Sequence, residues 1–177
     1  LGVGHSSGHL YLYDMYQPEE PARHVAPIDP AVVVHGKGEG HLAKVPITHL
    51  DFVGARKTAL MSTDARGLCF YHSLGRMLGM ESKDTLRLYG QYDAVASIPI
   101  HAAASLPLGT TRHVSDDHQF TALLLPQKLL LIGLQPSART WYRVMAHASS
   151  DTAALAWLPT THTDTNVHHP MLAYAFG

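Results

Sequence analysis

Residues 58–75 constrain the fold of this chain more than any other segment, because they contain two apolar runs joined by a short polar turn. In such a turn, the Asp64 side chain can accept hydrogen bonds from the backbone, and Gly67 can adopt a positive φ. A run that is apolar on both faces is typical of a strand between two other layers, as in the middle of a propeller blade. The segment therefore predicts the inner hairpin of a β-propeller blade. Its turn and blade motif comprises Asp64, Gly67, Phe70, Tyr71 and His72.

The same pattern occurs elsewhere in the chain. Gly8 lies 59 residues before Gly67 and is also followed by an apolar run, which ends at Asp14. A third copy covers residues 120–134, with Lys128 in the glycine position, 61 residues after Gly67. Residues 154–158 and 171–176 begin a fourth copy. A fixed period indicates repeated supersecondary units.

These repeats predict an all-β fold, a partial WD-type β-propeller of about three blades. The approximate blades are residues 1–30, 45–92 and 95–145, with an incomplete blade at 150–177. WD repeats have about 40 to 45 residues, so the longer period requires insertions, which we expect at residues 17–45 and 92–118. Since about four to eight blades close a ring, we interpret the chain as a fragment of a longer protein.

Composition argues against two classes of protein. The net charge is −1 and only 15% of residues are charged, without the basic clusters of a nucleic-acid-binding domain. No apolar run approaches the roughly 20 residues of a membrane-spanning helix. The single cysteine, Cys69, cannot form an internal disulfide, which fits a reducing, cytosolic setting.

One motif offers an enzymatic alternative. Residues 4–8 match G-x-S-x-G, the turn that presents a nucleophilic serine, here Ser6, in α/β-hydrolases. That chemistry needs a helix directly after the turn, whereas residues 9–13 are β-rich. We therefore keep a serine hydrolase as an alternative and expect no catalytic residue.

No cofactor or metal site is expected. Residues 36–40 are rich in glycine, but position 41 is His41, so the dinucleotide fingerprint is absent and an exposed connector is favoured. The densest histidine cluster contains His162, His168 and His169 with Asp164, and nothing in the sequence shows that they converge. We interpret the two adjacent aspartates, Asp116 and Asp117, as part of a solvated loop. We interpret His72 as a packed or hydrogen-bonded core residue.

At this level of detail the chain resembles one family. Residues 52–59, 62–64 and 67–75 are similar to the amino-terminal propeller of the vacuolar protein sorting-associated protein eight family, found in the CORVET tethering complex. Further resemblance lies at 38–42, 84–90 and 125–130, and more loosely at 157–176. Two positions differ, because the family more often has alanine at Cys69 and an acidic residue at Ala65.

The resemblance implies a non-enzymatic scaffold in endosomal vesicle docking and vacuolar or lysosomal protein sorting. Its implied partners are other tethering-complex subunits and an endosomal Rab GTPase, and it implies peripheral association, through partners, with the cytosolic face of early endosomes. An unrelated propeller adaptor remains an alternative. The sequence does not identify interface residues, and Trp141, Tyr142 and Arg143 fit either an interface or core packing.

Overall fold

The computed structural model describes most of the chain. The described residues are 1–34, 38–53, 59–73, 76–77, 80–81, 84–93, 97–106, 119–135, 139–144, 153–158 and 171–175. Within them the chain forms antiparallel sheets and one short helix, so the predicted all-β class is confirmed.

Two sheets form the first half of the chain. The first has the order β1 (Gly2–Gly4), β2 (Leu10–Leu12), β3 (Arg23–Val25). The second has the order β4 (Ile47–Val53), β5 (Ala59–Asp64), β6 (Cys69–Ser73), β9 (Thr85–Tyr89). The small hairpin of β7 (Arg76–Met77) and β8 (Met80–Glu81) lies between β6 and β9 in sequence.

Two further sheets follow. The third has the order β10 (Ala102–Ser105), β11 (Gln119–Leu125), β12 (Lys128–Gln135), β13 (Arg139–Val144). The fourth pairs β14 (Ala154–Leu158) with β15 (Met171–Ala175). In each of the four sheets, the strand order follows the chain order, as in the blades of a propeller.

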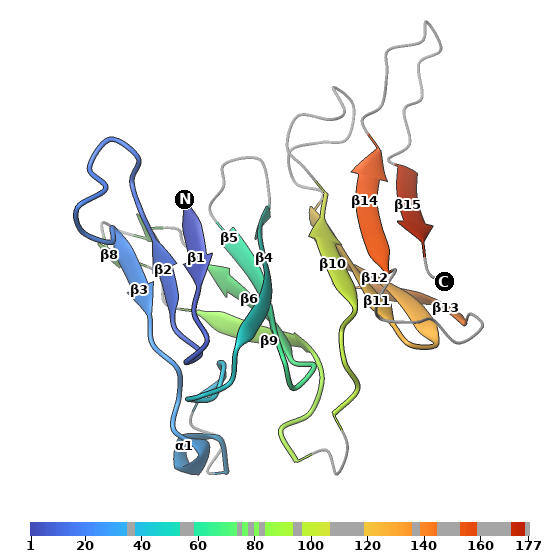
Figure 1. The fold of residues 1–177 in the computed structure, drawn as a ribbon, viewed down its shortest axis with the longest axis horizontal. Helices are drawn as coiled ribbons and strands as arrows, with labels where there is room; N and C mark the ends of the chain where they lie inside the picture. Colours follow the sequence, from blue (N-terminus) through green and yellow to red (C-terminus); the bar gives the residue numbers. More distant parts are fainter. Residues whose placement is uncertain are drawn as a thin grey trace, which may run out of the picture.

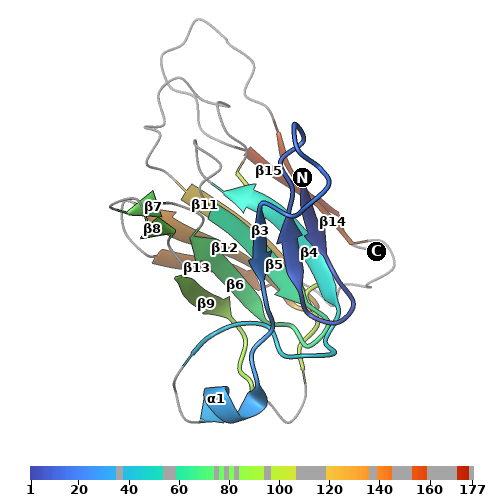
Figure 2. The ribbon, with the colours of Figure 1, turned by 90° about the vertical axis from the view of Figure 1, so that its left-hand side faces the viewer.

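The four sheets lie one behind another, face to face (Figure 2). Their first strands, β1, β4, β10 and β14, contact one another in that order and lie side by side in Figure 1. Hydrogen bonds connect these inner strands. The backbone N–H of Ser105 donates to Asp51 Oδ2 (2.7 Å), and Trp157 Nε1–H donates to the carbonyl of Ala104 (3.2 Å). The arrangement is that of consecutive blades around a common axis.

Strand β5 is buried on both faces. Leu60 packs toward the first sheet, in a cluster with Leu10 and Leu12. Its neighbours Ala59 and Met61 point the other way, because successive side chains of a strand alternate. They join the cluster between the second and third sheets, whose other buried members are Val53, Cys69, Ile100, Leu123, Leu125, Leu130 and Ile132. The prediction of a strand between two layers is confirmed.

The first two sheets share one turn geometry. Gly8 has a φ of 89° and Gly67 a φ of 79°, and each donates its N–H three residues back, to the carbonyl of His5 and of Asp64 respectively. The conformation favours glycine because a Cβ is strained at positive φ. The correspondence between Gly8 and Gly67 is therefore present in the backbone.

The third turn differs from the prediction. Lys128 was placed in the glycine position, but it is the first residue of β12 and pairs with Leu125. Only Pro126 and Gln127 connect the two strands, so the turn has no positive-φ position at Lys128. The assignment of Lys128 to the glycine position is therefore wrong, because a two-residue connection ends before that position.

The segment between the first two sheets contains a helix that the sequence did not indicate. Helix α1 (Pro30–Val34) follows Asp29, whose Oδ1 accepts a hydrogen bond from the backbone N–H of Ala31 (2.7 Å). Proline at the first helical position and a capping Asp are an ordinary helix start. The helix escaped detection because five residues show no helical period.

Candidate protein-binding surface

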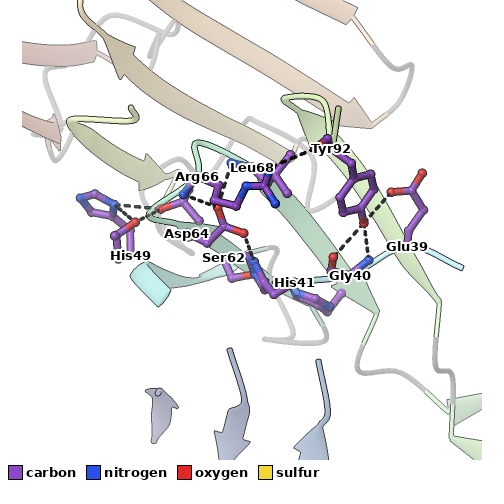
Figure 3. Close-up of polar contacts among 12 residues, drawn as sticks. Glu39, Gly40, His41, His49, Ser62, Asp64, Arg66, Leu68 and Tyr92 are labelled. Carbon is purple, nitrogen blue, oxygen red and sulfur yellow. Dashed lines mark hydrogen bonds and ion pairs between the residues drawn. The ribbon is translucent and has the colours of Figure 1, made fainter. Parts of the chain in front are cut away.

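A buried chain of polar side chains holds the second sheet together. His41 lies between two groups of β5, with Nδ1 2.7 Å from Asp64 Oδ2 and Nε2 2.6 Å from Ser62 Oγ (Figure 3). Ser62 Oγ lies 2.8 Å from His72 Nε2, and His72 Nδ1 lies 3.1 Å from Thr85 Oγ1. The relay therefore connects the segment before β4 with β5, β6 and β9.

One set of proton positions satisfies the whole relay. His41 Nδ1–H donates to Asp64, and the Ser62 hydroxyl donates to His41 Nε2. His72 Nε2–H then donates to Ser62, and the Thr85 hydroxyl donates to His72 Nδ1. This requires a neutral His72. Burial, followed by electrostatic interactions with His41 and Arg23, lowers the pKa of His72 to about 3, so its imidazole is neutral at physiological pH.

Asp64 also organises the turn after β5. Its Oδ1 accepts hydrogen bonds from the backbone N–H groups of Arg66 (2.9 Å) and Leu68 (3.1 Å). The same carboxylate thus closes the turn and binds His41. Because charge-assisted hydrogen bonds of a buried carboxylate are strong, the turn is held in one geometry, with Arg66 exposed at its tip.

Tyr92 connects that turn to the segment before β4. Its hydroxyl accepts from the N–H of Gly40 (2.9 Å), lies 2.7 Å from the Gly40 carbonyl and 3.2 Å from Glu39 Oε2 (Figure 3). Its own carbonyl accepts from the Arg66 guanidinium (3.0 Å). Burial raises the pKa of Tyr92 to about 12, so the hydroxyl stays protonated.

Arg87 completes the arrangement from β9. Its guanidinium carbon lies 4.9 Å from the centre of the Tyr92 ring, and a guanidinium nitrogen lies 3.4 Å from Glu39 Oε1. Both arginines are therefore held by Tyr92, one by its carbonyl and one by its ring.

Two open cavities flank these arginines. The larger, of about 920 Å³, is lined by Pro30, Val33, Leu42, Tyr92 and the acidic Glu39 and Asp93, besides both arginines. The smaller, of about 510 Å³, is lined by Arg66, Arg87, Leu88 and Ile98 and by the backbone around Gly67 and Gly90. Arginine and tyrosine beside apolar residues are the composition of protein-binding hot spots. We call the surface around Arg66, Arg87 and Tyr92 the arginine surface.

The structure places the residues of the predicted motif in different roles. Asp64 and His72 belong to the relay. Phe70 is buried, with its ring edge-on to His41 at 4.6 Å between centres, while Tyr71, on the opposite face of β6, packs against the cluster between the second and third sheets. Asp14 lies apart from them, where its Oδ1 accepts from the backbone N–H of Tyr16 (2.9 Å) in an exposed turn.

Two interpretations from the sequence need correction. Residue 40, interpreted as part of an exposed connector, is buried and hydrogen-bonded to Tyr92, because it borders His41. Core packing of Tyr142 and Arg143 is wrong, since all of β13 is exposed at the outer edge of its sheet. Trp141 is half-exposed beside Phe120.

The serine motif lacks the context it requires. Strand β2, and not a helix, follows Ser6. The neighbouring His5 forms a hydrogen bond with Ser7, with 2.6 Å between His5 Nδ1 and Ser7 Oγ. The geometry of a nucleophile elbow is therefore not formed at this turn. Two groups of residues considered in the sequence lie outside the described residues. They are the histidine cluster of His162, Asp164, His168 and His169, and the aspartate pair at 116–117.

The sequence reasoning missed His41, Arg66, Arg87 and Tyr92. A signal existed for one of them, because Gly40-His41 matches the G-H pair of the WD repeat signature. The other three carried no signal, since an arginine in a turn or an outer strand, or a tyrosine in a loop, is ordinary until its neighbours are known.

In the comparison with family models, the chain matches "Vps8 beta-propeller" over residues 1–177. The chain belongs to the Vps8 beta-propeller family. No curated protein matches it, and no solved structure does. The predicted resemblance is confirmed, and with it the partial propeller.

Membership of the Vps8 beta-propeller family indicates the general role of the chain. The family is a non-catalytic scaffold in a multi-protein tethering and sorting complex, and it is associated with endosomal trafficking. Within the part of the chain that the structure describes, no helix is both long and apolar enough to cross a membrane.

Proposed function

We propose that this chain is the propeller of a CORVET-like tethering subunit that binds other subunits of the complex and an endosomal Rab GTPase in its GTP state. The observation that carries the proposal is the match of the Vps8 beta-propeller over residues 1–177. Through these partners the subunit associates peripherally with the cytosolic face of early endosomes, where it contributes to vesicle docking before fusion.

The physical properties of the propeller support a binding role. Apolar clusters between consecutive sheets and the buried relay make the blades a rigid support. The arginine surface combines Arg66 and Tyr92, which lie in loops, with Arg87 of the outer strand β9, and binding residues commonly lie in loops on such a support. A rigid body that presents exposed loops is suited to holding several proteins together.

Nucleotide-dependent pulldown tests the Rab assignment. The full-length protein that carries this propeller is captured with an early endosomal Rab loaded with GTP or with GDP. We expect retention by the GTP form and little by the GDP form. Equal retention in both states, or none in either, would count against the tethering role.

A labelling experiment tests the enzymatic alternative. The full-length protein is treated with a fluorophosphonate probe, with Ser6→Ala as the matched control. We expect no labelling that depends on Ser6, because the turn lacks its helix and Ser6 is exposed next to β2. Labelling lost only in Ser6→Ala would establish a reactive serine and contradict the scaffold proposal.

A further inference from the structure

The smaller cavity of the arginine surface has an unbalanced charge. Arg66 and Arg87 both line it, and none of the described residues along its wall carries a carboxylate. The acidic residues near these arginines, Glu39 and Asp93, line the larger cavity instead. Two positive charges therefore line the smaller cavity, and the carboxylate paired with one of them, that of Glu39, lies outside its wall.

The two arginines are held in place before any ligand binds. Arg66 donates to the carbonyl of Tyr92 (3.0 Å), and Arg87 stacks on the Tyr92 ring at 4.9 Å. Glu39 Oε1 lies 3.4 Å from Arg87 and offsets part of its charge. A guanidinium has five N–H donors, and within the described part of the chain Arg66 uses one of them for the Tyr92 carbonyl. The remaining N–H donors of Arg66 can bind a carboxylate in bidentate geometry. Because the side chain is already held, this binding costs little conformational entropy.

The backbone that forms one wall of the cavity is tightly packed. Gly67 packs so closely on the backbone of Ile98 that a Cβ at residue 67 would lie 2.0 Å from the Ile98 carbonyl oxygen. Gly90, with a φ of 92°, also packs closely on Gly67, since a Cβ at residue 90 would lie 2.6 Å from the Gly67 carbonyl oxygen. The side chain of Ile98 is 53% exposed beside them and provides an apolar surface.

We propose that this cavity binds an acidic linear segment of a partner protein. An Asp or Glu carboxylate of the segment accepts hydrogen bonds from Arg66 and Arg87, and a neighbouring apolar side chain packs against Ile98. This inference rests on the proposed function as a protein-binding scaffold and specifies the chemistry of one partner.

The surroundings favour a peptide over an anionic membrane. Recognition of anionic lipids typically uses clusters of four to eight Lys or Arg residues. The described wall of this cavity contains two arginines and no lysine, and the whole chain has a net charge of −1. An apolar residue and two glycine backbones beside two arginines fit a short segment with both acidic and apolar side chains.

Peptide selection tests the proposal. A phage-displayed library of random dodecapeptides is selected on the full-length protein, and one recovered peptide is labelled with fluorescein for anisotropy titration. We expect the selected peptides to be enriched in Asp and Glu. Arg66→Gln should raise the Kd of the peptide about tenfold, because the variant loses a charge-assisted hydrogen bond. The matched control is Arg139→Gln, an exposed arginine of β13, which should leave the Kd unchanged.

Further measurements separate the outcomes. Changing the Asp and Glu residues of the peptide to Asn and Gln should reproduce the effect of Arg66→Gln, and thermal melting should show that the variants are folded. Selection without acidic enrichment, or equal binding by Arg66→Gln, would overturn the proposal. Arg66-dependent binding to vesicles with phosphatidylinositol phosphates, but to no peptide, would also overturn it in favour of a lipid.

The same variants distinguish this inference from the proposed function. If the wild-type protein shows no GTP-dependent Rab binding but binds acidic peptides through Arg66, the Rab assignment fails and the cavity assignment stands. If Rab binding is GTP-dependent and no acidic peptide is selected, the cavity assignment alone fails.

Discussion

Nδ1 of His41 lies 2.7 Å from Oδ2 of Asp64, and both side chains are almost completely buried. This contact joins the segment before β4 to the end of β5. Asp64 simultaneously closes the turn that carries Arg66, so the buried pair and the arginine surface depend on one carboxylate. The stability of the second sheet and the geometry of the surface are therefore coupled.

Removing the carboxylate of Asp64 should destabilise the folded protein. We expect Asp64→Ala to lower the free energy of unfolding by about 3 kcal/mol, because it leaves His41 and two backbone N–H groups without their acceptor. Denaturant unfolding of the full-length protein, followed by a probe in the propeller, measures the change. Asp14→Ala, in an exposed turn, is the matched control and should change stability far less. Equal effects of the two variants would contradict the role of the buried pair.

The relay should make stability depend on pH. The pKa of His72 is about 3 in the folded state and about 6.5 when unfolded, so between these values the unfolded chain binds an additional proton. The contribution of His72 is thus complete above about pH 6.5 and is lost as the pH falls toward 3, by up to about 1.4 kcal/mol per pH unit.

Unfolding measured at pH 7 and pH 5 checks this dependence. We expect the wild-type protein to lose more stability than His72→Gln over this range, because the amide does not titrate. His24→Gln, an exposed histidine of β3, should behave as wild type. The same pH dependence in His72→Gln and wild type would show that other groups cause it.

The turn glycine should not tolerate a side chain. At Gly67, a φ of 79° and a Cβ position 2.0 Å from the Ile98 carbonyl oxygen both oppose alanine. We expect Gly67→Ala to destabilise the protein by roughly 1–3 kcal/mol. Gly38→Ala is the control, because its nearest contact would be Val32 Cγ1 at an ordinary 3.4 Å. Thermal unfolding of both variants gives the comparison, and a stable Gly67→Ala would refute the close approach.

The hydroxyl of Tyr92 should matter more than its ring to the segment before β4. Tyr92→Phe keeps the surface under Arg87 but removes the hydrogen bonds to Gly40. We expect a loss of about 1–2 kcal/mol, since Gly40 is buried and its N–H would lose its partner. Hydrogen exchange of the Gly40 amide should accelerate in the variant. Unchanged exchange would mean that another group protects this amide.

Local chemistry made the central part of the fold predictable. Residues 59–61 and 68–71 are apolar runs, and the turn between them combines an Asp that binds the backbone with a glycine that takes a positive φ. These properties depend on near neighbours in the chain, so the hairpin, its burial on both faces and the matching turn at Gly8 could be predicted. The geometry of the turn before Lys128 could not be predicted, because similar pairs of strands can be joined by turns of different length.

By itself, the sequence determined the β class, the repeated hairpins and the family, because each follows from the order of residues along the chain. Only the tertiary structure decided which distant polar groups meet. His41 lies 23 residues from Asp64, and Tyr92 lies 52 residues from Gly40. Such pairs form because strand pairing and packing in the second sheet bring its flanking loops together, and a buried polar group is stable only where a partner meets it. The arginine surface is a product of this packing.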